Sequence, residues 1–300
     1  MKSDNTQSTI GIIGGSGIYD LDKLTDAQWI DVESSFGKPS DSILIGFIND
    51  QRVAFLPRHG RGHRYSPSEI NYLANIDALK RCGVNRLFSF SAVGSLSEKI
   101  KPGTFVIVDQ FIDQTFARKK SFFYDGFVAH VSMANPVCSD LGDIVEQTAR
   151  KIKLHVKRGG TYLVMEGPQF STLAESRLYR TLGSDIIGMT NMPEAKLARE
   201  AEIAYCSIAM VTDYDCWHDD HDNVTAQSVL VTLSKNISEA KRLIQTTITS
   251  VDKVFKPCSD GCNTSLDNAL CTGLKFRSET SQRKLETVAK RVINKSGWID

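Results

Sequence analysis

The sequence has almost no excess of charge of either sign, and this argues against two classes of partner. Its 300 residues include 36 lysines and arginines against 35 aspartates and glutamates, a formal net charge of +1. Proteins that bind nucleic acid or anionic membranes usually carry a basic surplus. No uncharged apolar run approaches the roughly 20 residues that cross a bilayer. The polar first residues, MKSDNTQST, also lack the apolar core of a signal peptide. We therefore expect a cytoplasmic protein that binds neither nucleic acid nor membrane.

Cysteine is also sparse, and its distribution does not indicate a disulfide framework. The seven cysteines are odd in number, and four lie singly in apolar or mixed surroundings: Cys82, Cys138, Cys206 and Cys216. Scattered thiols are typical of a reduced, cytosolic protein. Cys258, Cys262 and Cys271 cluster near the C-terminus at a spacing that is not typical of a zinc site. For this cluster, intersubunit disulfides, a metal clip and a cap on the active site stay open; we favour a cap or oligomer contact and expect no metal.

Strand-like and helix-like segments alternate along most of the chain, which predicts an α/β protein. Apolar runs typical of strands buried on both faces occupy residues 86–94, 104–112, 161–166 and 203–213. Ser66 to Glu69 combines an N-cap, a first-turn proline and a capping-box glutamate, and predicts a helix that ends at Gly83. Thr172 and Glu175 repeat the capping-box spacing before a helix that stops at Gly183. A long helix is expected over about 225–254.

The chain divides into a large unit and a short extension. No Pro/Ser-rich linker interrupts the first part, so residues 1–256 are expected to form one α/β domain. Residues 257–300 form a C-terminal extension with a Cys-rich segment and a basic helix over about 281–295. The apolar residues of that helix would pack on the main domain: Leu285, Val288, Val292 and Ile293.

A glycine-rich turn follows the first strand-like stretch, in the segment TIGIIGGSGIYDL. It lacks the lysine of a Walker loop. The position three residues beyond Gly17 is Asp20, whereas a dinucleotide fingerprint needs glycine there. What remains is a Gly-Gly-Ser-Gly nest whose amides and Ser16 hydroxyl suit a small anion, with a plain tight turn as the alternative.

Three further segments carry groups suited to an oxyanion. LPRHGRGHRYSPSE contains Arg58 and His59, SFSAVGSL contains Ser91, and MTNMPEAKLARE contains Thr190 ahead of a helix start. Arginine offers a planar fork of donors that suits an oxyanion; a solvated basic loop is the alternative for its segment. All three segments follow predicted strands, at the edge where open α/β sheets bind ligands.

Two carboxylates lie at the end of the last strand-like run, in MVTDYDCWH. Asp213 and Asp215 flank Tyr214, so strand alternation would aim both the same way. Such a pair suits acid–base chemistry if burial raises one pKa. A helix N-cap or a surface turn is the alternative.

Taken in order, six motifs resemble those of the 5′-methylthioadenosine phosphorylases, within the trimeric purine nucleoside phosphorylase family: GIIGGSG, PRHG, SAVGSL, MEGPQFST, GMTNMPEAKLARE and TDYDCW. The resemblance runs from about Ile10 to Val251. It implies a three-layer α/β/α nucleoside phosphorylase-like fold with a mixed central sheet and a helical C-terminal extension. It further implies reversible phosphorolysis of 5′-methylthioadenosine to adenine and 5-methylthioribose 1-phosphate, in purine and methionine salvage. Phosphate would be a co-substrate, no cofactor is implied, and the protein would be a homotrimer or a hexamer of two trimers.

The resemblance also assigns roles to residues. The phosphate ligands would be Ser16, Arg58, His59, Ser91, the Ala92 amide and Thr190. The nucleoside would be held by Met189 against the ribose, Phe170 stacked on the purine with Ser171 nearby, and Asp213 and Asp215 on the base. Asp213, protonated in a water-poor pocket, would act as the general acid. His130 would reach the 5′ substituent in a neighbouring subunit's site.

The base preference rests on two positions of the resemblance. Relatives that prefer 6-oxopurines tend to carry asparagine in place of Asp213 and a glutamate near Ser171. A carboxylate accepts hydrogen bonds from a 6-amino group, so adenine is expected. A 6-oxopurine or broad purine nucleoside phosphorylase stays as the alternative, as does a nucleoside-binding module without catalysis.

Overall fold

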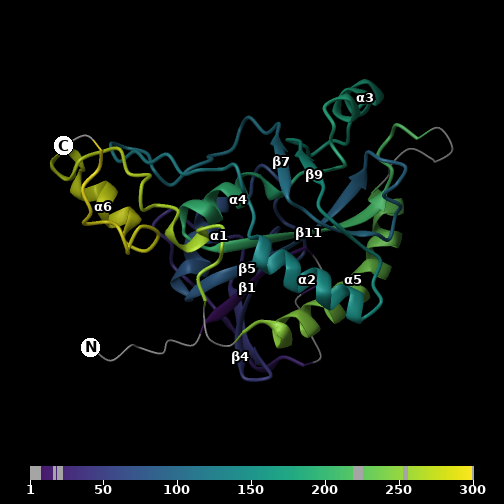
Figure 1. Cartoon of the computed structure of the whole chain (residues 1–300), viewed down its shortest axis with the longest axis horizontal. Coiled ribbons are helices and arrows are strands. Elements are labelled where there is room, and N and C mark those ends of the chain that lie inside the picture. Colours follow the sequence, from purple (N-terminus) through teal and green to yellow (C-terminus); the bar gives the residue numbers. More distant parts are fainter. Residues whose placement is uncertain (1–7, 16–17, 19–22, 219–225, 253–255, 299–300) are drawn as a thin grey trace.

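The computed structural model describes residues 8–15, 18, 23–218, 226–252 and 256–298, and its centre is a mixed sheet (Figure 1). In the described residues the sheet has eleven strands, of which eight follow the order β2-β3-β4-β1-β5-β10-β9-β7. β11 pairs with β5 and β6, and β6 also pairs with β8. The strands are β1 (Thr9–Gly14), β2 (Thr25–Ile30), β3 (Ile43–Ile48), β4 (Gln51–Pro57), β5 (Val84–Ser95), β6 (Phe105–Ile107), β7 (Gln110–Asp113), β8 (Val156–Arg158), β9 (Thr161–Val164), β10 (Ile186–Gly188) and β11 (Ala204–Asp213).

The central strands β1, β5 and β11 are buried along nearly their whole length. β1 runs parallel to β4 and β5, and β5 runs parallel to β11. The predicted strands over 86–94 and 203–213 are confirmed as β5 and β11, and 161–166 as β9. The single strand predicted over 104–112 is wrong. At Val108 and Asp109 the chain passes from β6, which pairs with β11, to β7, which pairs with β9.

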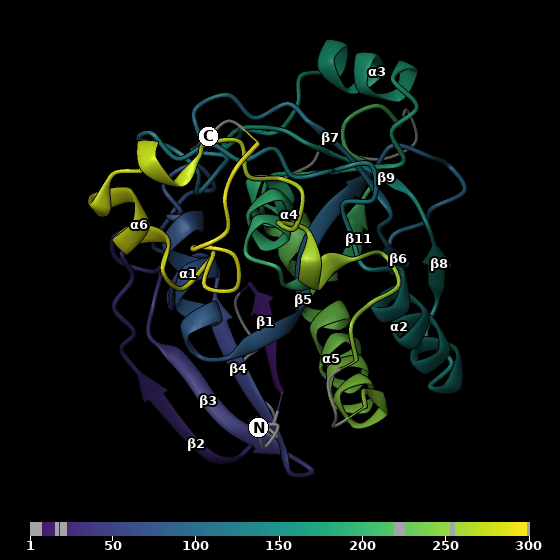
Figure 2. The ribbon, with the colours of Figure 1, turned by 60° about the vertical axis from the view of Figure 1, so that its left-hand side comes forward.

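Helices cover both faces of the sheet, so the expected three layers are present (Figures 1 and 2). α1 (Tyr72–Arg81) and α4 (Asn191–Glu200) share one apolar cluster with one side of the strands. α2 (Ser139–Lys151) and α5 (Ala226–Ser250) contact each other, and both contribute to a second cluster on the other face. α3 (Leu173–Thr181) projects from one end of the molecule. Among the described residues, no helix combines the length and apolar character that a membrane crossing needs.

The capping signals in the sequence predict the start of α3 correctly and the start of α1 wrongly. Thr172 and Glu175 form the expected capping box at the start of α3. The helix expected from Ser66 instead begins after Asn71, whose side chain accepts a hydrogen bond from the Ala74 amide. Ser66 and Glu69 bond to each other within a turn, so their capping signal does not start a helix.

The C-terminal extension shares the core of the main domain. The helix predicted over 281–295 is wrong in length: α6 covers only Glu279–Leu285, and turns follow it. Leu266, Leu285 and Val292 are nevertheless buried in the apolar cluster that contains α1 and α4. Leu270 pairs with Ala129 in an isolated antiparallel bridge. The extension therefore packs against both the helical layer and the segment around residue 129.

Candidate active site

The predicted site residues gather where the parallel strands end. β1 ends at Gly14 and β4 at Pro57, and the two ends are tied by the Arg58 amide, which donates to the Gly14 carbonyl at 3.0 Å. β11 ends beside β5, with Asp213 opposite Gly94. This carboxyl edge is where open α/β sheets bind ligands. Ser16, predicted to bind phosphate, lies outside the described residues.

Arg58 is fully buried and is held by a carboxylate that sequence reasoning missed. Its Nε and Nη2 donate to the two oxygens of Glu194, at 2.7 and 3.1 Å. Nη2 also donates to Ser89 Oγ and Nη1 to the Phe90 carbonyl, at 2.6 and 2.8 Å. Burial lowers the pKa of Arg58, but the Glu194 charge outweighs it and the net shift is upward. A guanidinium has five N–H donors, so these four bonds leave one, on Nη1, without a partner among the described residues.

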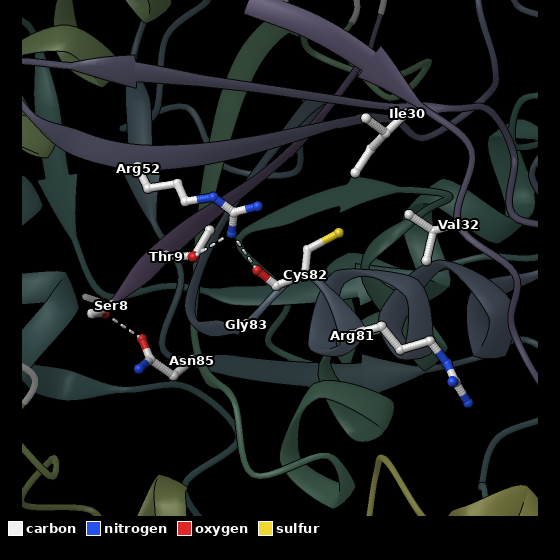
Figure 3. Close-up of a pocket in the computed structure, with 9 residues that line it drawn as sticks. All are labelled: Ser8, Thr9, Ile30, Val32, Arg52, Arg81, Cys82, Gly83 and Asn85. Carbon is white, nitrogen blue, oxygen red and sulfur yellow. Dashed lines mark hydrogen bonds between the residues drawn. The ribbon is translucent and has the colours of Figure 1, made fainter. Parts of the chain in front are cut away.

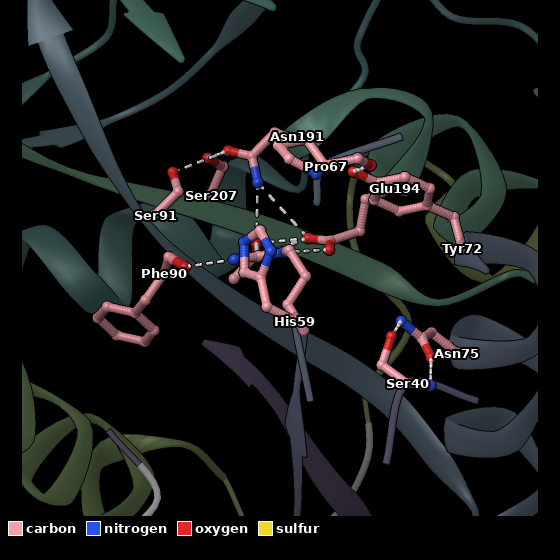
Figure 4. A network of polar contacts seen from close by, with 12 residues as sticks. Ser40, His59, Pro67, Tyr72, Asn75, Phe90, Ser91, Asn191, Glu194 and Ser207 are labelled. Carbon is pink, nitrogen blue, oxygen red and sulfur yellow. Dashed lines mark hydrogen bonds and ion pairs between the residues drawn. The ribbon is translucent and has the colours of Figure 1, made fainter. Parts of the chain in front are cut away.

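Asn191 links this ion pair to the hydroxyls of the predicted phosphate site (Figure 4). Its Nδ2 donates to Ser89 Oγ at 3.0 Å, and its Oδ1 accepts from Ser207 and Ser91 at 2.8 and 3.3 Å. In the sequence, Asn191 and Glu194 only mark the helix start expected in MTNMPEAKLARE. That reading holds for α4, but both side chains point inward and organise the polar centre.

The phenol of Tyr162 is a second group that the sequence did not single out. Its hydroxyl is buried and has no hydrogen-bond partner among the described residues. Burial raises the pKa of Tyr162, while the neighbouring hydroxyls of Ser91 and Thr190 lower it. An unpaired buried hydroxyl is costly, so a polar ligand beside Ser91 and Thr190 would satisfy it. Ala92 follows on β5 and Thr190 is the N-cap position of α4.

His59 is held in its neutral form. Burial and the adjacent Arg58 charge lower the pKa of His59 to about 4. Its Nδ1 lies 2.9 Å from the Tyr65 carbonyl, and its ring stacks on His63. Because a carbonyl only accepts, Nδ1 carries the proton and Nε2 is left as an acceptor.

The two aspartates lie together at the end of β11, but the strand alternation predicted for them is wrong: β11 ends at Asp213, and Asp215 lies in the turn that follows, with φ of +53°. Asp213 Oδ1 accepts from the Asp215 amide at 2.8 Å, and Oδ2 accepts from Thr212 Oγ1 at 2.7 Å. Burial, aided by the Asp215 charge, raises the pKa of Asp213 in spite of these two bonds. A Cβ on Gly94 would lie 2.8 Å from Asp213 Oδ1, so the glycine makes room for the carboxylate. Burial thus favours the neutral carboxyl of Asp213, while the two accepted bonds favour the carboxylate.

Asp215 faces α3 and has an unsatisfied oxygen. Its Oδ2 and the hydroxyl of Ser176 are buried and have no hydrogen-bond partner within the described part of the chain. Burial raises the pKa of Asp215, whereas Ser176 and Ser171 lower it. Ser176 is a further residue that sequence reasoning missed, since a serine inside a helix carries no signal of its own.

Four further predicted residues remain: Met189, Phe170, Ser171 and His130. Met189 is half-buried, and a Cβ on Gly167 would lie 2.5 Å from its sulfur, so the MEGPQF turn packs on it. Phe170 is 45% exposed, an open ring available for stacking. The Ser171 carbonyl accepts from the Cys216 thiol at 3.3 Å, which ties its segment to the end of β11. His130 is exposed, and its amide donates to Ala269 of the extension; among the described residues no recorded bond joins it to the other site residues.

A pocket of about 570 Å³ opens at the opposite edge of the sheet (Figure 3). Ser8, Arg52, Gly83 and Asn85 line it, at the amino ends of β1, β4 and β5. Arg52 is already bonded there to Thr9 Oγ1 and the Cys82 carbonyl. The pocket contains none of the predicted site residues. Open α/β sheets bind ligands at the carboxyl edge, not at this amino edge.

Comparison with known proteins agrees with this geometry. A family model described as the phosphorylase superfamily matches residues 9–249. The S-methyl-5′-thioadenosine phosphorylases of Rhodospirillum rubrum and Cereibacter sphaeroides are 58% and 53% identical, covering 98% and 96% of this chain and 100% and 99% of their own lengths. A methylthioadenosine phosphorylase structure from an antarctic soil metagenomic library superposes with TM-score 0.88 at 45% identity, covering 94% of this chain and 99% of that one. The Schistosoma mansoni enzyme in complex with adenine gives TM-score 0.76 at 36% identity, covering 81% and 91%.

Proposed function

The chain belongs to the phosphorylase superfamily, and we propose that it catalyses the reversible phosphorolysis of 5′-methylthioadenosine to adenine and 5-methylthioribose 1-phosphate. The observation that carries this proposal is a buried carboxyl with a raised pKa, Asp213, at the same sheet edge as the polar centre around Arg58. Relatives that match nearly the whole chain carry the name of that activity. The nucleoside phosphorylase fold supplies the frame for both groups.

In this proposal phosphate lies among Arg58, His59 and the hydroxyls of Ser91 and Thr190, with the Ala92 amide and Ser16 as further donors. Within the described part of the chain, one N–H of Arg58 has no recorded partner, and the buried Tyr162 hydroxyl lies beside Ser91 and Thr190; both observations support the placement. Neutral His59 presents an acceptor at Nε2, which suits the protonated oxygen of monohydrogen phosphate. Holding phosphate beneath the sugar would supply much of the rate through orientation.

The base is proposed to lie against Asp213 and Asp215, with Phe170 stacked on its ring, Ser171 beside it and Met189 under the ribose. As the glycosidic bond breaks, positive charge develops on the sugar and negative charge on the purine. A protonated Asp213 would deliver its proton to N7 and neutralise that charge. Asp215, beside Ser171 and Ser176, would accept a further hydrogen bond from the base. The chemistry requires no metal and no organic cofactor.

We also propose a homotrimer, or a hexamer of two trimers, acting in the cytoplasm in purine and methionine salvage. His130 would complete a neighbouring subunit's site at the 5′ substituent. Several large apolar side chains are exposed, as a subunit interface would require. Three of them precede His130 in the sequence and one lies in the extension; their exposed fractions are 83% for Phe116, 48% for Tyr124, 40% for Val128 and 61% for Phe276.

A substrate panel tests the proposed activity. We expect adenine release from 5′-methylthioadenosine only when phosphate is present, because phosphate captures the sugar. We expect kcat/KM for inosine and methylthioinosine to be at least about 100-fold lower than for 5′-methylthioadenosine. A 6-oxo group cannot donate a hydrogen bond, so it would leave the buried carboxylate that faces it unpaired. Reaction would be followed by chromatography of the free base, with adenosine as a probe of the 5′ group. Release without phosphate would instead indicate a hydrolase, and preferential cleavage of inosine would reverse the base assignment.

A further inference from the structure

Three cysteines and an aspartate converge at the junction of the main domain and the extension. Cys138 precedes α2, whereas Cys258, Asp260 and Cys262 belong to the extension. One ligand atom from each lies within 4.8 Å of all the others. The grouping expected from sequence is therefore wrong: Cys138 joins Cys258 and Cys262, while the Cys271 thiol turns to the Ala269 carbonyl.

The loop from Cys258 to Cys262 is shaped to aim its side chains inward. The Gly261 amide donates to the Cys258 carbonyl, and Gly261 has φ of +63°, a conformation that favours glycine. The Cys262 amide donates to Cys258 Sγ at 3.1 Å. Amide hydrogen bonds to sulfur orient and stabilise a thiolate ligand.

Asp260 is held in place by Ser139, at the start of α2. Asp260 Oδ2 accepts from the amide and the hydroxyl of Ser139, at 2.7 and 2.6 Å. Ser139 opens α2, where a negative charge is favoured by the helix dipole. The carboxylate is thus held against Cys138 by two bonds across 121 residues of chain.

The charge environment favours thiolates. Arg199 donates through Nη1 to Cys262 Sγ at 3.3 Å and through Nη2 to the Asp260 carbonyl at 3.1 Å. Cys138 and Cys262 are only 1% and 2% exposed, whereas Cys258 and Asp260 are half-buried, so the cluster extends from the core to the surface.

We propose that Cys138, Cys258, Cys262 and Asp260 together bind one zinc ion. Tetrahedral zinc with bonds of about 2.3 Å to sulfur needs ligand atoms roughly 3.8 Å apart, within the spread of this cluster. Thiolates select zinc over magnesium or calcium. On binding, each cysteine that is still protonated releases its proton to solvent. Three thiolates and a carboxylate exceed the metal's charge by two, and Arg199 offsets part of that excess.

The ion would fasten the extension to the start of α2. On the C-terminal side of Cys262, Leu266 is buried in the apolar cluster that contains α1 and α4, and Leu270 pairs with Ala129. Its four ligands are distinct from the residues proposed to bind phosphate and nucleoside. The clip is structural, and it can fail while the proposed catalytic site remains correct.

Metal analysis of the full chain, purified without added metal or a polyhistidine tag, tests the clip. We expect about one zinc per chain in the wild type and in the control Cys271→Ser. The loss of one ligand in Cys258→Ser or Asp260→Asn should weaken zinc binding at least about tenfold, measured by competition with a chromogenic chelator. Replacement by cobalt(II) should give the intense d–d absorption and thiolate charge-transfer bands of a tetrahedral thiolate site.

Two results would overturn the proposal. One is a chain without zinc that has all seven thiols free and shows no cobalt(II) thiolate spectrum. The other is a chain lighter by two hydrogens, in which Cys138 is crosslinked to Cys258 or Cys262. If a variant does not fold, the wild-type metal content and cobalt spectrum still decide. Adenine release measured in parallel reports on the catalytic site separately.

Discussion

Replacing Asp213 with asparagine is expected to lower kcat for adenine release by about 10²–10⁴-fold, the usual contribution of a positioned general acid. Asparagine has nearly the same shape, and its amide oxygen can still accept the hydrogen bond from the Asp215 amide. It cannot supply a proton. The loss should therefore appear in kcat, with the KM for phosphate little changed.

The pH profile distinguishes proton donation from mere positioning. Burial raises the pKa of Asp213, and in the proposed mechanism the protonated carboxyl is the active form. Wild-type activity should thus fall as pH rises through that raised pKa, and Asp213→Asn should lack this alkaline limb. Asp31→Asn, at an exposed position next to β2, serves as the control with unchanged kcat. Full activity with an unaltered profile in Asp213→Asn would remove the general-acid role.

Replacing Glu194 with alanine is expected to destabilise the protein by about 3–5 kcal/mol, because it leaves the buried Arg58 guanidinium without its counter-charge. The carboxylate also accepts from Ser89 Oγ and the Tyr205 hydroxyl, at 2.5 and 2.9 Å. Those donors would lose their acceptor as well. Since domains are stable by only about 5–15 kcal/mol, we expect a much lower midpoint of urea unfolding.

Two controls separate this effect from a general sensitivity to mutation. Glu279→Ala removes the partner of Arg283 in an exposed ion pair, which is expected to change stability little. The double variant Arg58→Met with Glu194→Met removes both buried charges and should recover part of the lost stability without activity. Wild-type stability in Glu194→Ala would contradict the view that this pair organises the site.

Sequence patterns located the elements that are buried on both faces and failed where long-range pairing decides. β5 and β11 were predicted because a central strand is buried on both faces and is therefore rich in apolar residues. The chain breaks between β6 and β7 because β6 pairs with β11 and β7 pairs with β9. A local sequence pattern does not indicate which strand will be the partner. Capping spacing recurs in turns, so the signal at Ser66 misplaced the start of α1.

The same distinction applies to the site. Asp213 and Arg58 follow directly from strands, and their position at the sheet edge could be predicted. Glu194 was read as a helix-start residue, because nothing in the sequence says that it meets Arg58 across 136 residues. Cys138 was read as an isolated thiol for the same reason. Long-range partners of buried charges and thiols become visible only in the folded chain.

The central claim is that an oxyanion and an adenine lie side by side at the carboxyl edge of the sheet, and a crystal grown with selenate and adenine tests it most directly. The anomalous signal of selenium should place the anion within hydrogen-bond distance of Thr190 and Ser91, with the purine against Asp213. An anion held elsewhere, such as beside Arg52 at the opposite edge, together with a purine distant from Asp213, would contradict the account.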